Sequence, residues 1–86
     1  MFFRDTTRRV LSFLLESTGA YGLQITAATG VNKDVVYQLM RRLEAAGMVS
    51  AVNEVGDPSH LRRPLRRYYS LTEPTARFLR LDALST

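Results

Sequence analysis

The sequence predicts a small α+β fold that is mostly helical, and three observations lead to this prediction. The chain has 86 residues, of which 45% are hydrophobic, so it can bury one compact core. In its first half, apolar residues recur three and four positions apart, which is the period of an amphipathic helix. After Gly47 that period gives way to short β-favouring runs separated by a turn-rich stretch.

A first helix is expected over about residues 6–18. Asp5 is a suitable N-cap, and the apolar residues at positions 10, 11, 14 and 15 form i,i+4 pairs on one face. Gly19 is expected to end this helix. Phe2 and Phe3 precede it and are too apolar for a free tail, so they pack either on their own domain or against a second chain.

A short helix, a tight turn and a longer helix follow. The short helix is expected over about residues 23–29 and is closed by Gly30. Asn32 is expected to cap the longer helix, which runs to about residue 46. The clearest helical repeat in the chain is that of this helix's apolar residues, Val36, Leu39, Met40 and Leu43.

The second half of the chain predicts a long hairpin and a last helix. β-favouring residues at 48–55 and 68–71 flank a connection that contains Pro58 and Pro64. Because proline has no backbone N–H for a strand ladder, this connection is expected to be an exposed, mobile arm. Thr72 is expected to cap a helix over about residues 73–84.

This order of elements is that of a winged helix-turn-helix, with three helices, a two-stranded wing and a short C-terminal helix. The sequence indicates a single domain over residues 1–86. Within it, the helix-turn-helix is expected at about 22–47, the wing at about 48–71 and the last helix at about 73–84.

Two groups of residues resemble the PadR-type winged-helix transcriptional regulators. The first group comprises Tyr21-Gly22, Val31-Asn32, Val36-Tyr37 and the run Met40-Arg41-Arg42-Leu43-Glu44-Ala45-Ala46-Gly47-Met48-Val49. The second is Arg66-Arg67-Tyr68-Tyr69-Ser70-Leu71-Thr72-Glu73. The resemblance covers about residues 8–80 and implies a DNA-binding winged helix whose Tyr37 hydroxyl bonds a backbone phosphate.

The sequence departs from the family pattern at two places. Lys33-Asp34 stand where family members have a small or proline-bearing start to the recognition helix. Family members also continue into long C-terminal helices that form the dimer, whereas this sequence stops at Thr86. The resemblance therefore implies a minimal form of the family.

The net positive charge lies in one segment. The chain carries 12 Lys and Arg against 8 Asp and Glu, a formal charge of +4, and Lys33 is its only lysine. Residues 61–72 hold four arginines and no acidic residue, so this run alone carries a charge equal to that of the whole chain. Arginine binds phosphates and guanine edges through a rigid fork of donors. A G·C-rich genome would also favour arginine, but it would not gather the charge in one hairpin.

These features predict two DNA-contacting elements. From the recognition helix, the expected contacts are Asn32, Lys33, Val35, Tyr37, Gln38, Arg41 and Arg42. Gln can bond adenine, Lys can reach guanine and Val can meet a thymine methyl in the major groove, while arginines further along reach phosphates. From the wing, expected beside the minor groove, they are His60, Arg62, Arg63, Arg66 and Arg67.

Three of these assignments have alternatives. Tyr37 could instead be a half-buried aromatic that supports the wing, and Arg42 could pair with a carboxylate. The arginine-rich hairpin could be a solvated loop. Asp34 is expected to favour the helix dipole rather than to contact DNA.

A homodimer, or several copies on DNA, is expected because sequence-specific recognition normally uses two half-sites. The apolar residues expected to pair the chains lie at the two ends of the sequence: Phe2, Phe3, Leu11, Phe78, Leu79, Leu81 and Leu84.

The favoured function is a small transcriptional regulator that binds double-stranded DNA, a repressor of the size used by phages, plasmids or mobile elements. One alternative is a DNA-bending architectural or recombination-directionality factor. A second is a protein-interaction winged helix that binds a transcription component and pairs the arginines with acidic residues.

Catalysis, cofactors and metals are not expected. The chain has no cysteine and His60 is its only histidine, so it lacks the usual zinc-ligand patterns. No apolar run approaches the roughly 20 residues that span a bilayer, so a cytoplasmic protein is expected. The chain is too short for an obvious small-molecule effector domain.

Overall fold

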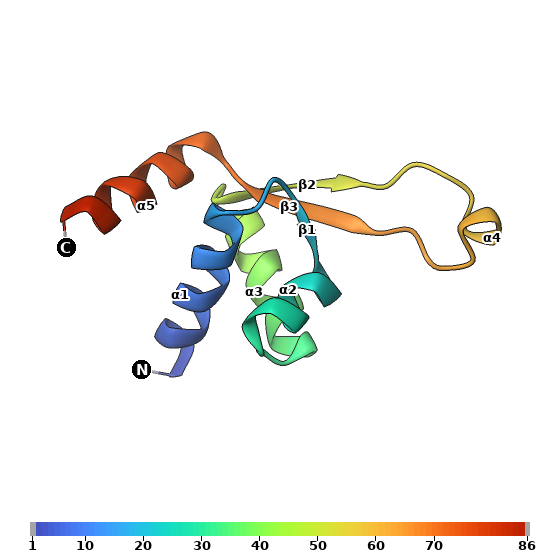
Figure 1. The fold of residues 1–86 in the computed structure, drawn as a ribbon, viewed down its shortest axis with the longest axis horizontal. Helices are drawn as coiled ribbons and strands as arrows, with labels where there is room; N and C mark the ends of the chain where they lie inside the picture. Colours follow the sequence, from blue (N-terminus) through green and yellow to red (C-terminus); the bar gives the residue numbers. More distant parts are fainter. Residues whose placement is uncertain (1, 86) are drawn as a thin grey trace.

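A computed structural model describes the backbone of residues 2–85 and the side chains of residues 5–82. Its elements are α1 (Phe2–Leu15), β1 (Ala20–Tyr21), α2 (Gly22–Thr29), α3 (Lys33–Ala45), β2 (Val49–Asn53), α4 (Pro58–Leu61), β3 (Arg67–Leu71) and α5 (Glu73–Ser85). Figure 1 shows α1, α2 and α3 grouped together, the β2–β3 hairpin extending away to α4, and α5 leaving in the opposite direction. The described chain is therefore elongated, with extents of 47, 26 and 21 Å.

The first three helices meet in one apolar core. Its largest fully buried side chains are Val10, Leu14, Ile25, Val36 and Met40. Val10 and Leu14 are one turn apart on α1, as are Val36 and Met40 on α3, so the buried faces follow the helical repeat of the sequence. Burial of these side chains is the main force that holds the short α2 in place.

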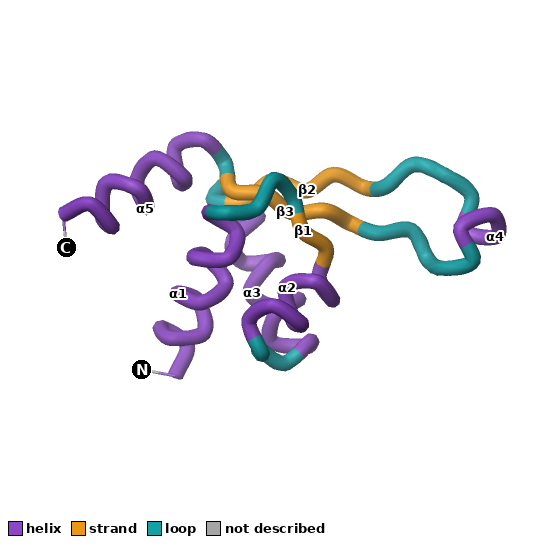
Figure 2. The backbone as a smooth tube through the Cα atoms, viewed as in Figure 1, coloured by secondary structure: helices purple, strands orange, loops and turns teal. Residues whose placement is uncertain are grey.

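The three strands form one antiparallel sheet in the order β1-β3-β2. Strands β2 and β3 pair from Val49 opposite Leu71 to Asn53 opposite Arg67. Figure 2 shows that the strands occupy the end of the hairpin nearest the helices. The fold is thus mostly helical α+β with the element order of a winged helix-turn-helix, which confirms the predicted fold class. Strand β1 is an addition, because two residues are too few to give a sequence pattern.

The ends of α1 differ from the prediction. The helix begins at Phe2, so Asp5 lies in its first turn instead of capping it. It ends at Leu15, where the N–H groups of Glu16 and Ser17 donate to carbonyls three residues back. Gly19 therefore does not end the helix. Its φ of +142° instead lets the chain turn into β1.

The connection between β2 and β3, residues 54–66, is called the wing arm below. It contains a short helix, α4, where the sequence predicts only an exposed loop. Asp57 caps α4 by accepting a 2.9 Å hydrogen bond from the Ser59 N–H, and Pro58 occupies a position where no donor is needed. The same turn-forming residues that indicate a loop thus begin a helical turn.

Candidate nucleic-acid interface

Helix α3 presents a polar face to solvent at its N-terminal half. Asn32 caps the helix, with its Oδ1 accepting a 2.8 Å hydrogen bond from the Asp34 N–H, which leaves its amide group as a donor. The exposed side chains of α3 expected at the DNA are Lys33, Tyr37, Gln38, Arg41 and Arg42. Asp34 is also exposed among them, so a carboxylate lies within the face that would enter a groove.

Val35 lies at the edge of this face. It is half-buried and packs against the core. Together with Gln38 and Arg42, it lines a small crevice against Thr6 and Thr7 of α1. This edge of α3 therefore meets the first helix rather than the wing.

Tyr37 lies across the start of α2. A Cβ atom at Gly22 would come within 2.6 Å of the Tyr37 Cζ and 2.7 Å of its hydroxyl oxygen. Gly22 thus leaves the space that the ring occupies, while Tyr37 remains 38% exposed. The Tyr37 ring therefore packs over the start of α2 and still presents surface to solvent.

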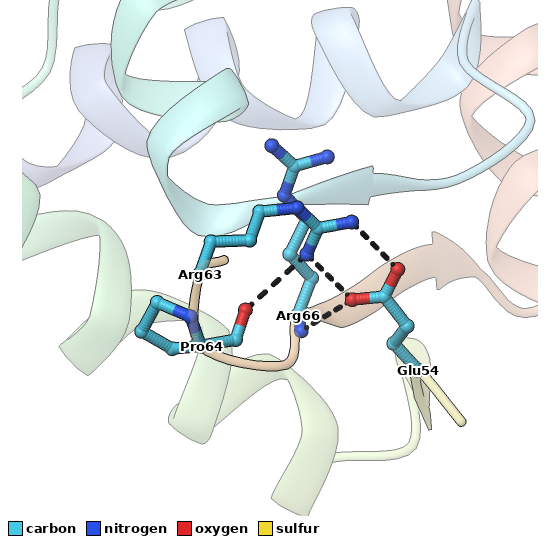
Figure 3. Close-up of polar contacts among 4 residues, drawn as sticks. All are labelled: Glu54, Arg63, Pro64 and Arg66. Carbon is cyan, nitrogen blue, oxygen red and sulfur yellow. Dashed lines mark hydrogen bonds and ion pairs between the residues drawn. The ribbon is translucent and has the colours of Figure 1, made fainter. Parts of the chain in front are cut away.

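Glu54, just beyond β2, binds two arginines of the wing arm (Figure 3). Its Oε1 lies 2.7 Å from Arg63 Nη1 and its Oε2 lies 2.8 Å from Arg63 Nη2. The backbone N–H of Arg66 also donates to Oε1, at 3.0 Å. The hydrogen bond from Arg63, followed by that from Arg66, lowers the pKa of Glu54 from 4.5 to about 2. Because the folded-state pKa is depressed, any stabilisation is present above pH 4.5 and is lost as the pH falls through about 2.

Arg67 joins the wing to α3. Its Nη2 donates to Glu44 Oε2 at 2.6 Å, and its Nη1 donates to Asn53 Oδ1 at 3.0 Å. Glu44 comes from the last turn of α3, whereas Asn53 is the residue opposite Arg67 across the hairpin. The hydrogen bond to Glu44 raises the pKa of Arg67 above its ordinary value.

Arg66 joins the wing to the start of α2. Its guanidinium carbon lies 4.0 Å from the centroid of the Tyr21 ring. Tyr21 in turn meets Tyr68 edge to face, with ring centroids 5.8 Å apart. A cation over an aromatic face is attracted by the ring quadrupole, so this stack holds the base of the wing against the helix-turn-helix.

Two of the four wing arginines are therefore paired within the chain. The run 61–72 contains no acidic residue, but Glu44 of α3 binds Arg67, and Glu54 at the start of the wing arm binds Arg63. The interpretation of the wing as an uncompensated cationic segment is therefore wrong. Sequence reasoning missed both carboxylates because their partners are set by the register of the hairpin and by the packing of α3.

Eight of the twelve predicted DNA-contacting residues fall into three places. Tyr37, Arg63, Arg66 and Arg67 line one groove between α2 and the wing, of about 740 Å³, together with Leu23, Gln24 and Leu65. Gln38 and Arg42 lie on the α1 side of α3. His60 and Arg62 are exposed in α4 and at its end, near the tip of the wing arm.

The predicted dimer residues are only partly described. Phe2, Phe3 and Leu84 have side chains that lie outside the described residues. Leu11 packs against the core, and Leu79 is half-buried. Phe78 and Leu81 of α5 are 68% and 61% exposed.

No three His, Asp or Glu side chains with described positions are grouped so that they could hold a metal ion. Over the same part of the chain, no helix has the length and apolar character needed to cross a membrane.

Comparison with known proteins identifies the fold. No protein-family model and no curated protein matches the sequence. Among solved structures, a PadR family transcriptional regulator from Eggerthella lenta DSM 2243 matches 96% of this chain and 74% of its own, with 28% identity and a TM-score of 0.70.

Two more distant structures share the fold. A PadR-like transcription factor from Bacteroides fragilis matches 99% of this chain and 88% of its own, at 22% identity and a TM-score of 0.71. The protein smu.1704 from Streptococcus mutans UA159 matches 92% of this chain and 74% of its own, at 18% identity and a TM-score of 0.69. These matches confirm the resemblance read from the two residue groups, and the chain has the winged helix-turn-helix fold of PadR-type regulators.

Proposed function

We propose that this chain is a DNA-binding transcriptional regulator that reads double-stranded DNA with α3 in the major groove and the wing on the flanking backbone. The observation that carries the proposal is the groove between α2 and the wing, where Tyr37 of the recognition helix lies beside the wing arginines. The match to a PadR family transcriptional regulator supports it.

Each part of the interface has a distinct role in this proposal. Asn32, Lys33 and Gln38 present amide and ammonium groups that suit base edges in the major groove. Arg41, Arg42, Arg62 and Arg66 suit phosphates, which position the protein without reading sequence. Bound over a promoter as a single cytoplasmic domain, the chain acts as a repressor by excluding other proteins from the site.

A comparison of two kinds of variant tests this function. Lys33→Ala and Gln38→Ala are expected to lose about 1–3 kcal/mol of discrimination between the selected site and other sequences. Arg62→Ala is expected to weaken binding to all sequences and to reduce the slope of log affinity against log salt by about one. Fluorescence anisotropy with a site selected from random DNA measures both effects.

The control is Arg80→Ala, which removes an exposed charge from α5, away from the interface. It is expected to leave discrimination and the salt slope close to those of the unchanged chain. Absence of any DNA binding at about 50 mM salt, where phosphate contacts are strong, would contradict the function. Binding with a long footprint and a bend would instead indicate an architectural factor.

A protein-interaction winged helix is the second candidate, and the ion pairs favour it. Arg63 and Arg67 are paired with Glu54 and Glu44, as expected of a surface whose arginines are not devoted to phosphates. A partner from the transcription machinery that stays bound after nuclease treatment, with no DNA affinity of the purified chain, would support this candidate.

The proposal includes a homodimer formed through α5. This helix projects from the body of the molecule (Figure 1). Its Phe78 and Leu81 side chains are largely exposed. Light scattering is expected to give the mass of a dimer, and Phe78→Glu is expected to give a monomer because it places a charge in the apolar contact. Arg80→Ala on the same helix is the control. A monomeric mass both with and without DNA would contradict the dimer but not DNA binding.

A further inference from the structure

We propose that Glu54 is a positioning residue that aligns the wing for DNA, and that its partner Arg63 is a structural clamp rather than a phosphate contact. The inference rests on the proposed DNA-binding function. The sequence alone does not distinguish the wing arginines from one another. The inference divides them into those that hold the wing in place and those that contact DNA.

Glu54 closes the wing arm one step beyond the last strand pair. The sheet register ends with Asn53 opposite Arg67. Next along the chain, the Glu54 N–H donates to the Arg66 carbonyl at 2.7 Å, and the Arg66 N–H donates to Glu54 Oε1 at 3.0 Å. The carboxylate therefore replaces the backbone acceptor that a further strand pair would supply. It also binds Arg63, which lies on the returning branch of the wing arm, after α4.

These contacts occupy the Arg63 side chain. Both of its terminal nitrogens bond Glu54, and Nη1 also donates to the Pro64 carbonyl at 3.2 Å. The Arg63 and Glu54 side chains are only 29% and 18% exposed. A phosphate could engage Arg63 only after this two-bond pair had opened, which would leave a half-buried carboxylate without its cation.

The same contacts orient Arg66. Because both backbone polar groups of Arg66 bond Glu54, the direction of its side chain is set, and it points away from Glu54 toward β1 (Figure 3). There its guanidinium lies over the Tyr21 ring. Stacking uses one face of the guanidinium and leaves its N–H groups, which lie in the plane, able to donate to a phosphate. Among the described residues, no side chain or carbonyl accepts a hydrogen bond from this guanidinium.

The variant Glu54→Gln tests whether Glu54 positions the wing or acts only through its charge, because the two possibilities change DNA affinity in opposite directions. It preserves shape and raises the formal charge of +4 by one, so charge alone predicts tighter DNA binding. Loss of the clamp predicts the opposite, a weakening of about three- to tenfold, because the Arg66 guanidinium is no longer held where it can donate to a phosphate.

Asp57→Asn is the matched control on the same arm. It removes the same charge, but asparagine caps helices as well as aspartate does, so α4 is retained. Its DNA affinity is expected to stay equal or to rise. Arg63→Lys is the complementary variant, since it keeps the charge and loses the two-bond geometry. It is expected to bind DNA as weakly as Glu54→Gln, and the double variant no more weakly than either single one.

A spectroscopic readout reports the position of Arg66 directly. In the unchanged chain, the Arg66 side-chain protons over the Tyr21 ring are expected to show ring-current shifts by NMR. Glu54→Gln is expected to lose these shifts while the circular dichroism of the helices is kept. If Glu54→Gln does not fold, Arg63→Lys provides the same readouts.

The outcomes separate this inference from the proposed function. Tighter binding by Glu54→Gln, wild-type affinity of Arg63→Lys, or retained ring-current shifts in both variants would overturn the positioning role. Failure of the unchanged chain to bind any DNA would overturn the function itself.

Discussion

Gly22→Ala is expected to displace Tyr37 and to destabilise the domain by about 1–3 kcal/mol, the usual cost of overpacking. The added Cβ would lie 2.6 Å from Cζ of the Tyr37 ring, well inside van der Waals contact. Intrinsic helix propensity opposes this effect, because alanine is favoured over glycine within helices by about 1 kcal/mol. The steric term is larger, so the net change is expected to be destabilising.

A double-mutant cycle with Tyr37→Ala isolates the contact. Without the ring, Gly22→Ala is expected to be neutral or to stabilise the domain by up to about 1 kcal/mol, since only propensity remains. Urea unfolding of the four proteins measures each free energy of unfolding. An equal loss in both backgrounds would show that the Tyr37 ring does not set the requirement for glycine at this position.

Met40→Ala is expected to destabilise the domain by about 2–5 kcal/mol. Met40 has no exposed surface and packs between the helices at the centre of the core. Truncation removes buried apolar contacts and leaves a cavity that the surrounding helices close only in part. Since small domains have about 5–15 kcal/mol of total stability, a considerable unfolded fraction is expected on warming.

The matched control for this effect is Leu23→Ala. Leu23 is 55% exposed on α2, so its truncation is expected to change stability by no more than about 0.5 kcal/mol. Thermal and urea unfolding monitored by circular dichroism give both values. A loss of less than about 1 kcal/mol in Met40→Ala would mean that the core can collapse around the missing side chain.

The arrangement of the wing links core stability to the proposed interface. Arg67 bonds Glu44 at the end of α3, and Arg66 stacks on Tyr21 at the start of α2. The wing is thus attached to both helices of the helix-turn-helix. A displacement of either helix changes where the wing lies relative to the recognition face.

Much of the fold could be predicted because its patterns are local. The helical repeat ending at Leu43 marks the buried face of α3, and Asn32 caps that helix as the residue type indicates. The boundaries that failed depend on neighbours distant in sequence. Strand β1 forms because Tyr21 pairs with Tyr68 of β3. A run of two residues is too short for this pairing to be predicted from sequence.

Sequence patterns and a family resemblance were sufficient to predict the winged helix-turn-helix fold and to propose the set of candidate DNA contacts. This was possible because helix periods, caps and turn residues act over a few positions. Tertiary structure decided which arginines are available. Glu54 and Arg63 are nine residues apart, and Glu44 and Arg67 are 23 apart. Their pairing follows from hairpin register and helix packing, which bring opposite charges together at distances that no local pattern encodes.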